Sequence, residues 1–371
     1  MISYIIWNAN PEILSIGSFS LRWYGLLFAL GFLISQQVLY YIYKKEGKPV
    51  EDVDTLTIYM VLATIIGARL GHIFFYQPEL LWEDPLGVFL PFEFSPEFKF
   101  TGLQGLASHG AAIGILFALW LYSRKKKPGQ NYLQVLDRIV IVVALTGCLI
   151  RLGNFFNSEI IGKPTDSAIG VAFMGRIDEA LQRDDFGESP VQSVSIVKDT
   201  EQPDGANGQK PILIYLFFKE GTQKMTVTQF CRSNVKFYLT RLNEYVAESM
   251  AHELKYEILE EKPGVFVAKI NTFAIARHPA QLYESISSFL LFAMLFWIWL
   301  REKEKIATGK IFGIFMIILW SLRFFYEFLK ENQVPFEDNL ALNMGQILSI
   351  PLVMVGIGVL IWSNRNAATK T

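Results

Sequence analysis

The sequence predicts an all-α polytopic membrane protein with seven transmembrane helices, an outside N-terminus, a cytoplasmic C-terminus and an extracytoplasmic α/β insert between spans four and five. Hydrophobic residues make up 51% of the 371 residues, and the mean hydropathy is positive, which the surface of a soluble domain of this length rarely tolerates. Seven apolar runs also approach the 17 to 25 residues or so that a spanning helix needs. Basic residues alternate between the connections, which fixes the orientation.

The seven predicted spans divide the chain into three parts. Spans one to four fall within residues 1–173, the polar insert covers 174–270, and spans five to seven fall within 271–371. In chain order the spans are Leu21–Tyr43, Val53–Tyr76, Leu106–Tyr122, Val135–Leu152, Gln281–Leu300, Ile311–Leu329 and Gly345–Trp362.

Charge in the connections predicts which end of each span is cytoplasmic. Lysines and arginines gather after spans one, three and five, whereas the other connections are richer in glutamate and aspartate. Positive charge marks the cytoplasmic side, so the N-terminus is predicted outside and the C-terminus inside. The basic residues are Lys44, Lys45, Lys48, Arg124, Lys125, Lys126, Lys127, Arg301, Lys303, Lys305 and Lys310.

The insert has mixed charge and short apolar alternations. Pro211–Phe218 and Val265–Ile270 alternate as strands do, Gln202–Gly208 has loop composition, and Val235–Glu257 has helical spacing. A packing or shielding module is the favoured interpretation of the insert.

Several classes of function are not indicated. The net charge of −1 implies no nucleic-acid partner. The two cysteines, Cys148 and Cys231, lie in settings too different for a disulfide to be expected. No metal or cofactor is predicted, because no histidine and carboxylate stand at ligand spacing. Met1 is taken as part of the mature chain, because a basic leader and a small-residue cleavage site are missing.

Polar side chains gather at the span ends that are predicted to face outside. Residues 147–166 are the densest example, since an apolar run there ends in four polar residues. An arginine at a membrane edge is costly to desolvate, which favours a site. Several guanidiniums with few acids suit an anionic phospholipid headgroup, because arginine holds phosphate through paired hydrogen bonds. The residues are Tyr24, Arg69, His109, Arg151, Asn154, Asn157, Glu159, Arg323 and Glu327.

Each of these residues also has a structural interpretation. Arg323 and Glu327 stand four apart and can form a private ion pair. Arg69 can brace neighbouring spans, and Tyr24 can belong to an aromatic belt at the interface. A lone histidine such as His109 is more often structural, although its near-neutral pKa also suits a proton acceptor.

Six ordered motifs resemble one family, the bacterial prolipoprotein diacylglyceryl transferases. The resemblance implies an inner-membrane enzyme that transfers the diacylglyceryl group of phosphatidylglycerol to the lipobox cysteine of a prolipoprotein signal peptide. The implied products are a thioether-linked prolipoprotein and glycerol phosphate. The motifs are SLRWYGLLFALGF, GARLGHIFFY, SHGAAIG, RLGNFFNSEIIGKPTD, RHPAQLYES and LRFFYEFLKEN.

The resemblance also assigns site residues. The expected catalytic residues are His109, Arg151, Arg323 and Glu327. The expected substrate-binding residues are Tyr24, Arg69, Asn154, Glu159 and Gly162. The chain departs from the family pattern at Ala111, at Leu319 and in its enlarged insert.

A mechanism follows as a hypothesis. Arg151 and Arg323 are expected to clamp the lipid phosphate, and Glu327 and Glu159 to orient them. The thiol must ionise, with either His109 as base or the arginine field lowering its pKa. Two rivals remain open: a flippase for anionic lipid, whose site is expected nearer the midplane, and a structural scaffold.

Overall fold

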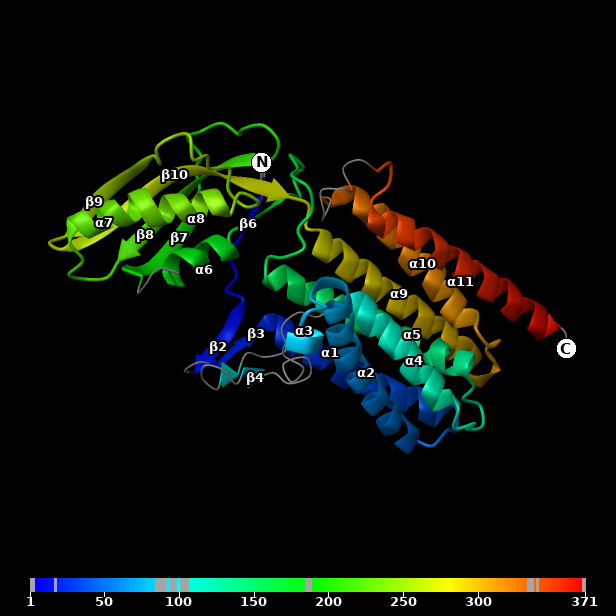
Figure 1. Ribbon diagram of the computed structural model, residues 1–371. Helices are drawn as coiled ribbons and strands as arrows, with labels where there is room; N and C mark the ends of the chain where they lie inside the picture. Colours follow the sequence, from blue (N-terminus) through cyan, green and yellow to red (C-terminus); the bar gives the residue numbers. More distant parts are fainter. Residues whose placement is uncertain are drawn as a thin grey trace. The chain divides into compact units, whose positions relative to one another are not determined.

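The computed structural model describes residues 4–16, 19–83, 92–93, 99–100, 107–183, 189–331, 337 and 340–368. Two compact units divide the chain (Figure 1). The first comprises residues 1–30, 147–288 and 322–349, and the second comprises 31–146, 289–321 and 350–371. Each unit is therefore assembled from three separate stretches of sequence.

Six helices within the described residues are long and apolar enough to cross a membrane. They confirm a polytopic membrane protein. A further apolar helix, α4 (Ser108–Ser123), is shorter, and Leu106, the predicted start of the third span, lies outside the described residues. The predicted first span begins too early, because Leu21 belongs to a strand. The six helices are α1 (Trp23–Lys45), α2 (Glu51–Tyr76), α5 (Tyr132–Phe156), α9 (Ala280–Glu302), α10 (Lys310–Tyr326) and α11 (Met344–Ala368).

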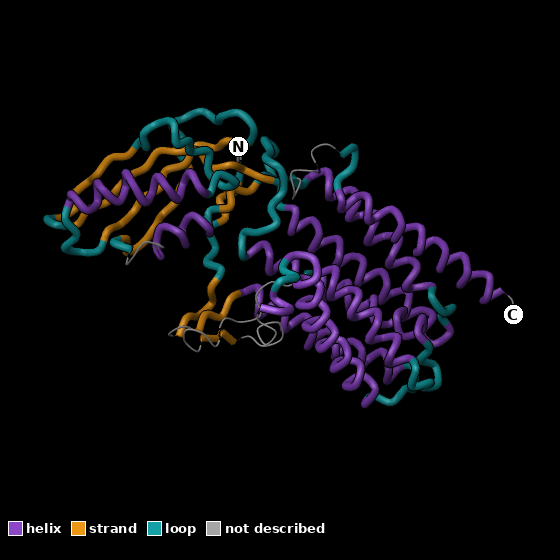
Figure 2. The backbone as a smooth tube through the Cα atoms, in the orientation of Figure 1, coloured by secondary structure: helices purple, strands orange, loops and turns teal. Residues whose placement is uncertain are grey.

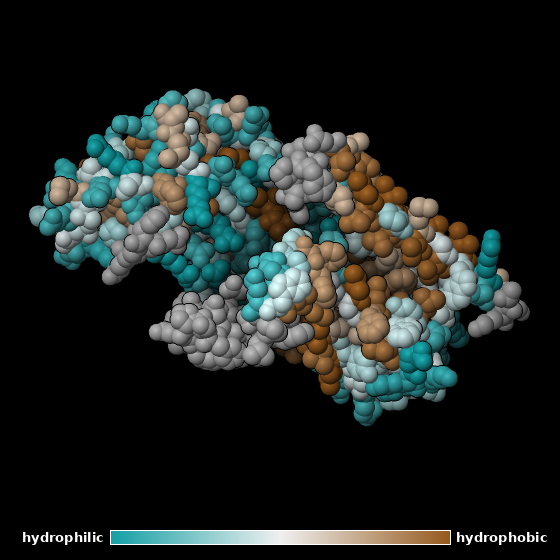
Figure 3. All heavy atoms as spheres, in the orientation of Figure 1, coloured by the Kyte–Doolittle hydropathy of each residue, from teal (hydrophilic) through white to brown (hydrophobic). Residues whose placement is uncertain are grey.

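The second unit is a helical bundle with α5 at its centre. Side chains such as Ile139 and Ile141 of α5 are almost completely buried together with Trp299 of α9. On the face drawn in Figure 3, much of the surface of the helices is hydrophobic. Leu33 and Ile113 are each more than half exposed, which fits a surface solvated by lipid tails.

Helices α2 and α4 pack through glycines. A Cβ on Gly110 would lie 2.2 Å from the carbonyl oxygen of Gly67 and 2.6 Å from Cα of Gly71. The backbone amide of Ala107 also donates a hydrogen bond of 2.9 Å to the carbonyl of Ala68. Because no side chains intervene, the two backbones are in direct contact, as is common between membrane helices.

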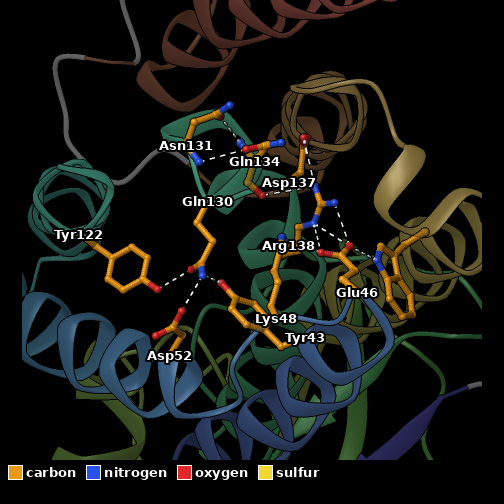
Figure 4. Close-up of polar contacts among 11 residues, drawn as sticks. Tyr43, Glu46, Lys48, Asp52, Tyr122, Gln130, Asn131, Gln134, Asp137 and Arg138 are labelled. Atoms are coloured by element: carbon orange, nitrogen blue, oxygen red, sulfur yellow. Dashed lines mark hydrogen bonds and ion pairs between the residues drawn. The ribbon is translucent and has the colours of Figure 1, made fainter. Parts of the chain in front are cut away.

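Charged residues are buried at the end of the second unit where the basic connections lie (Figure 4). Glu46 accepts hydrogen bonds from Arg138 (2.8 Å) and from the indole of Trp299 (2.7 Å), and it pairs with Lys48. Asp137 accepts from the backbone amides of Gly309 (2.7 Å) and Phe312 (2.8 Å), at the start of α10. Each buried charge has a partner, as burial requires.

The first unit contains a six-stranded sheet, so the chain is not all-α. The strand order is β1-β6-β10-β8-β7, with β9 paired to β10. The strands are drawn in orange in Figure 2. β1 and β6 are parallel, and the other pairs are antiparallel. β1, β6 and the end of β10 extend the sheet beyond residues 174–270. The strands are β1 (Ile5–Trp7), β6 (Val171–Phe173), β7 (Val191–Lys198), β8 (Gln209–Phe218), β9 (Tyr256–Lys262) and β10 (Val265–Arg277).

Short helices pack on this sheet and form a core with it. The strands predicted at Pro211–Phe218 and Val265–Ile270 are confirmed, and so is the loop at Gln202–Gly208. The helix predicted at Val235–Glu257 is wrong beyond Arg241, because its later apolar residues pair with the sheet instead: Val246 forms a β-bridge with Ala274. The helices are α6 (Gly175–Arg183), α7 (Lys224–Phe230) and α8 (Lys236–Arg241), with a π-helical turn, Cys231–Val235, between the last two.

Short elements complete the described residues. They include two antiparallel strand pairs and three short helical turns. One of these turns, at Glu327–Leu329, extends α10 and carries a predicted catalytic residue. The others are β2 (Glu12–Ile16), β3 (Phe19–Arg22), α3 (Leu80–Glu83), β4 (Phe92–Glu93), β5 (Lys99–Phe100) and the 3-10 turn Lys303–Lys305.

Candidate functional site

The end of α5 brings three of the predicted site residues into contact within the first unit. Arg151 donates a long hydrogen bond of 3.5 Å to the side-chain oxygen of Asn154. Asn154 is buried and donates one of 2.8 Å to Glu159. The residues on either side of Glu159 have left-handed backbone, with Ser158 at a φ of 52° and Ile160 at 57°. Non-glycine residues adopt this conformation only when the surroundings impose it.

A carboxylate of α9 holds Arg151 from the other side. The Nε atom of Arg151 lies 2.6 Å from an oxygen of Glu284, whose side chain is 13% exposed. The second oxygen of Glu284 forms an ion pair with Lys330. Neither Glu284 nor Lys330 was predicted as a site residue. Glu284 carried a signal, since an acid inside an apolar run needs a partner.

These contacts continue to the second predicted phosphate ligand. Lys330 lies 3.8 Å from Glu327, and Glu327 lies 3.9 Å from Nε of Arg323. We call the series Arg151, Glu284, Lys330, Glu327 and Arg323 the ion-pair relay. Its two arginine ends are the accessible members, with side chains 25% and 35% exposed, whereas the three middle members are between 9% and 13% exposed.

The charge of the relay favours an anion. Three cations and two carboxylates leave a formal charge of +1, and the exposed ends are both guanidiniums. Lys330 is buried, and its amine is already paired with two carboxylates, so it serves to hold the relay together. The two arginines are the relay members whose chemistry suits phosphate oxygens, because a guanidinium binds them through paired hydrogen bonds.

Glu327 is fixed in place by the start of α11. The side-chain amide of Asn343 donates a hydrogen bond of 3.2 Å to Glu327. A Cβ on Gly345 would lie 2.6 Å from the carboxyl carbon of Glu327. Only glycine leaves room for the carboxylate at this position.

Gly162 has a packing role in the same unit. Its amide donates a hydrogen bond of 3.0 Å to the carbonyl of His278, and a Cβ there would lie 2.7 Å from that oxygen and 2.9 Å from the carbonyl oxygen of Leu329. Arg277 is 4% exposed and donates to the carbonyl of Gly162 (3.0 Å) and to Glu331 (2.8 Å). The chain following α5 is thus tied to the segments that precede α9 and follow α10.

His278 stands beside this junction, just before α9. Burial lowers the pKa of its imidazole, because desolvation disfavours the charged ring. Its Nδ1 lies 3.3 Å from the hydroxyl of Tyr283. At neutral pH the ring is therefore predominantly neutral.

Tyr24 lies at the start of α1, against the end of α5. A Cβ on Gly153 would lie 3.0 Å from Cα of Tyr24, and Trp23 stacks on Phe156 at 4.9 Å between ring centroids. Tyr24 is half-buried. The structure thus brings Tyr24 beside the residues that follow Arg151.

Arg69 and His109 belong to the second unit. Arg69 follows Ala68, whose carbonyl accepts the amide of Ala107, and His109 stands two residues further along α4. The two side chains therefore lie at the same end of the α2–α4 helix pair. The side chain of His109 is exposed and that of Arg69 is half-buried.

No metal site is formed by the described residues, since none of them makes a group of three or more histidines, cysteines, aspartates or glutamates. Positive charge at the relay comes from the side chains of Arg151, Lys330 and Arg323.

Sequence comparisons give one family. A model of the family described as prolipoprotein diacylglyceryl transferase matches residues 11–362. Three similar proteins carry the name phosphatidylglycerol–prolipoprotein diacylglyceryl transferase. That from Bacteroides fragilis is 32% identical, over 99% of this chain and 98% of its own length. Those from Tolumonas auensis and Chloroherpeton thalassium are each 31% identical over 98% of this chain, covering 99% and 96% of their own lengths.

Proposed function

Because this chain belongs to the prolipoprotein diacylglyceryl transferase family, we propose that Arg151 and Arg323, the exposed ends of the ion-pair relay, bind the phosphate of its lipid donor. The chain transfers the diacylglyceryl group of phosphatidylglycerol to a cysteine thiol of prolipoproteins, the first step of lipoprotein maturation. A thioether forms, and glycerol phosphate is released.

The relay is the single observation that supports this assignment. Two arginines from different helices are tied through Glu284, Lys330 and Glu327, and only the arginines are substantially exposed. A carboxylate bound to a guanidinium fixes its orientation, as Glu284 does for Arg151 at 2.6 Å, and an oriented guanidinium can hold a phosphate through paired hydrogen bonds.

The reaction balances as a displacement at carbon. The thiolate sulfur attacks the glyceryl carbon that carries the phosphate ester, the carbon–oxygen bond breaks, and its electron pair leaves with glycerol phosphate. Negative charge grows on the leaving oxygen, where Arg151 and Arg323 stabilise it through preorganised hydrogen bonds. The thiol proton passes to His109, or the arginine field lowers the thiol pKa and solvent takes the proton.

The remaining predicted residues support the donor. Asn154 and Tyr24 hydrogen-bond headgroup or glyceryl oxygens, Glu159 orients Asn154, and Gly162 holds the turn that places them. Arg69 supplies a further cation. Glu327 orients Arg323, as their separation of 3.9 Å allows.

Transfer from phosphatidylglycerol to a synthetic lipobox peptide tests the proposal. Arg151→Ala and Arg323→Ala are each expected to lower kcat/KM by at least about 100-fold, the usual loss when one preorganised donor is removed. Arg301→Ala is the matched control and should retain full activity. Arg301 lies over the ring of Trp297, at the end of α9 opposite to Glu284. Retained transfer in either site variant would exclude the phosphate clamp.

The proton acceptor has its own test. His109→Gln should lower kcat by at least about 100-fold if His109 is the base. An unchanged kcat would leave ionisation by the arginine field as the route. A Cys→Ser peptide should accept no lipid in either case, because a hydroxyl ionises far less readily than a thiol.

The topology completes the proposal: seven spans in the bacterial inner membrane, including α4, with the N-terminus and the insert outside and the C-terminus in the cytoplasm. The basic residues after α1, α4 and α9 support it. α4 measures about 24 Å, so it spans only with help from local thinning or tilt of its neighbours. Alkaline phosphatase fused within the insert should be active, and the same fusion after residue 371 should be inactive. An inactive fusion in the insert and an active fusion after residue 371 would show the opposite orientation in the membrane.

The substrate peptide is proposed to be the signal peptide of a prolipoprotein. Only peptides with a lipobox cysteine should gain lipid, and the transfer should need no energy source. Lipid redistribution between leaflets without a covalent product would favour a flippase instead.

A further inference from the structure

An apolar groove runs along the lipid-facing side of the α2–α4 pair in the second unit. It encloses about 400 Å³. Its walls are large side chains, Ile58, Leu62 and Phe117, each more than half exposed. Its floor is made of small residues, among them Ala63, Gly67 and Gly114. We call it the α2–α4 groove.

The groove exists because its floor lacks side chains. A Cβ on Gly114 would lie 2.7 Å from the carbonyl oxygen of Ala63, and one on Gly67 would lie 2.6 Å from that of Gly110. The two helices therefore meet backbone to backbone. The large residues that flank this contact stand on both sides of it, which leaves a trench with an apolar lining and no side chain inside.

The length of the groove matches one leaflet of a bilayer. From Ile58 to Leu70 it follows α2 for 12 residues, which is about 18 Å. Half of a hydrocarbon core of about 30 Å is about 15 Å. Arg69 and His109 lie at the Leu70 end of the helix pair, where the hydrogen bond from Ala107 to Ala68 joins the helices. The groove thus runs from a polar, cationic end into the apolar interior.

We propose that the α2–α4 groove holds one acyl chain of the phosphatidylglycerol donor, with the glyceryl end of that chain directed toward Arg69 and His109. This inference rests on the proposed function, because it names the position of the substrate's tail. A phospholipid has the same order of groups, an anionic end followed by a chain that reaches the midplane. Charge complementarity at one end and depth at the other favour this occupant.

The helical segment of a signal peptide fits less well. A helix is about 10 Å across, so a length of 18 Å occupies about 1,400 Å³. That is more than three times the volume of the groove. Such a helix could rest only on the rims formed by Leu62 and Phe117, leaving the trench between them empty.

The groove positions the lipid donor and does not increase its binding affinity. A chain that moves from lipid tails onto leucine, isoleucine and phenylalanine gains no hydrophobic free energy, because both surroundings are equally apolar. What the groove supplies is orientation of the attached glyceryl group. A misplacement of about 1 Å at the reacting carbon can lower the rate by about 100-fold, so filling the groove should affect kcat more than KM.

The test fills the groove in the full-length protein and varies the chain length of the donor. Ala118→Phe places a ring in the groove from α4, and Leu62→Trp does so from α2, which guards against one variant failing to fold. Ile113→Phe is the matched control, since Ile113 is 63% exposed on the same helix and does not line the groove. With dipalmitoyl phosphatidylglycerol both groove variants should lose about tenfold in kcat. With the dioctanoyl lipid the loss should be under about twofold, because the short chain does not reach the filled part.

A photoreactive donor gives a readout that does not need turnover. Phosphatidylglycerol with a diazirine near the end of one acyl chain should crosslink to residues 58–62 and 117–118 in the unaltered protein, and Ala118→Phe should abolish these adducts. Adducts spread evenly over exposed helices such as α11 would mean bulk lipid only and would overturn the proposal. Equal losses of kcat with both donors, or losses no larger than that of Ile113→Phe, would also overturn the proposal. A rise confined to the KM of the peptide would overturn it too, because it would place the peptide in the groove.

The two proposals can fail separately. Transfer that survives Arg151→Ala, with the crosslinks unchanged, would remove the phosphate clamp and leave the acyl site. Loss of transfer in Arg151→Ala, with no crosslinks in the groove, would remove the acyl site and leave the phosphate clamp.

Discussion

Replacing Glu284 by glutamine should disable the relay while changing the shape of the side chain very little. Glu284 contacts Arg151 at 2.6 Å and also pairs with Lys330, and it is 13% exposed. Removing one partner of a buried ion pair costs about 3 to 5 kcal/mol. Because Arg151 is 25% exposed and water can reach it, we expect a loss near the lower figure, about 3 kcal/mol.

The effect on catalysis should exceed the effect on folding. Without Glu284, the guanidinium of Arg151 keeps, within the part of the chain that the structure describes, only the long hydrogen bond to Asn154, at 3.5 Å. It can then turn away from the position in which it meets the phosphate. A displacement of about 1 Å corresponds to about a 100-fold lower rate. We therefore expect Glu284→Gln to lower kcat by about that factor.

The assay is lipid transfer to a lipobox peptide, with thermal unfolding in detergent measured in parallel. Glu302→Gln is the matched control: it makes the same chemical change on the same helix, in an ion pair with Lys310 whose members are 28% and 37% exposed. Exposed pairs contribute about 0 to 1 kcal/mol, so activity and stability should hardly change. A kcat for Glu284→Gln within about threefold of the unaltered protein would refute the relay as a device that positions Arg151.

Three further outcomes are expected. Gly162→Ala should destabilise the folded protein by about 2 kcal/mol, since the new Cβ would meet backbone oxygens at 2.7 and 2.9 Å. Gly358→Ala on α11 is the control, and it should stabilise the protein slightly because a Cβ there has nothing within 4 Å. Melting temperatures in detergent compare the two variants. Asp137→Ala should destabilise by about 3 kcal/mol, because two backbone amides lose their acceptor, while the KM for phosphatidylglycerol stays unchanged. Burial raises the pKa of Cys231 to about 12, so at pH 8 only about one thiol in ten thousand is ionised; mass spectrometry should find maleimide on it only after denaturation, and rapid labelling of the native protein would contradict its burial.

Much of the membrane part could be predicted from local sequence. The free energy of transferring about 20 consecutive residues into lipid is the sum of the contributions of those residues. Local sequence therefore suffices to find spans, and six of the apolar runs correspond to spanning-length helices. The same reasoning identified Arg151 and Arg323 as unusual, because a guanidinium in an apolar run is expensive wherever it points.

The sheet shows where local reasoning stops. Ile5–Trp7 and Val171–Phe173 are strands of three residues that pair with each other across more than 160 positions. Such short segments carry no recognisable period, and only the partner decides that they are strands. Tertiary pairing also ended the predicted helix at Arg241, since Val246 bonds to the sheet through its backbone.

The sequence by itself determined that this protein lies in a membrane and which of its residues are too polar for their surroundings. Only the tertiary structure decided how those residues are neutralised: Glu284 pairs with Arg151, and Lys330 connects it to Glu327 and thereby to Arg323. The physical reason is range. Hydropathy is a property of neighbours along the chain, whereas an ion pair between helices depends on the rotation and height of each helix, which are set by packing over the whole unit.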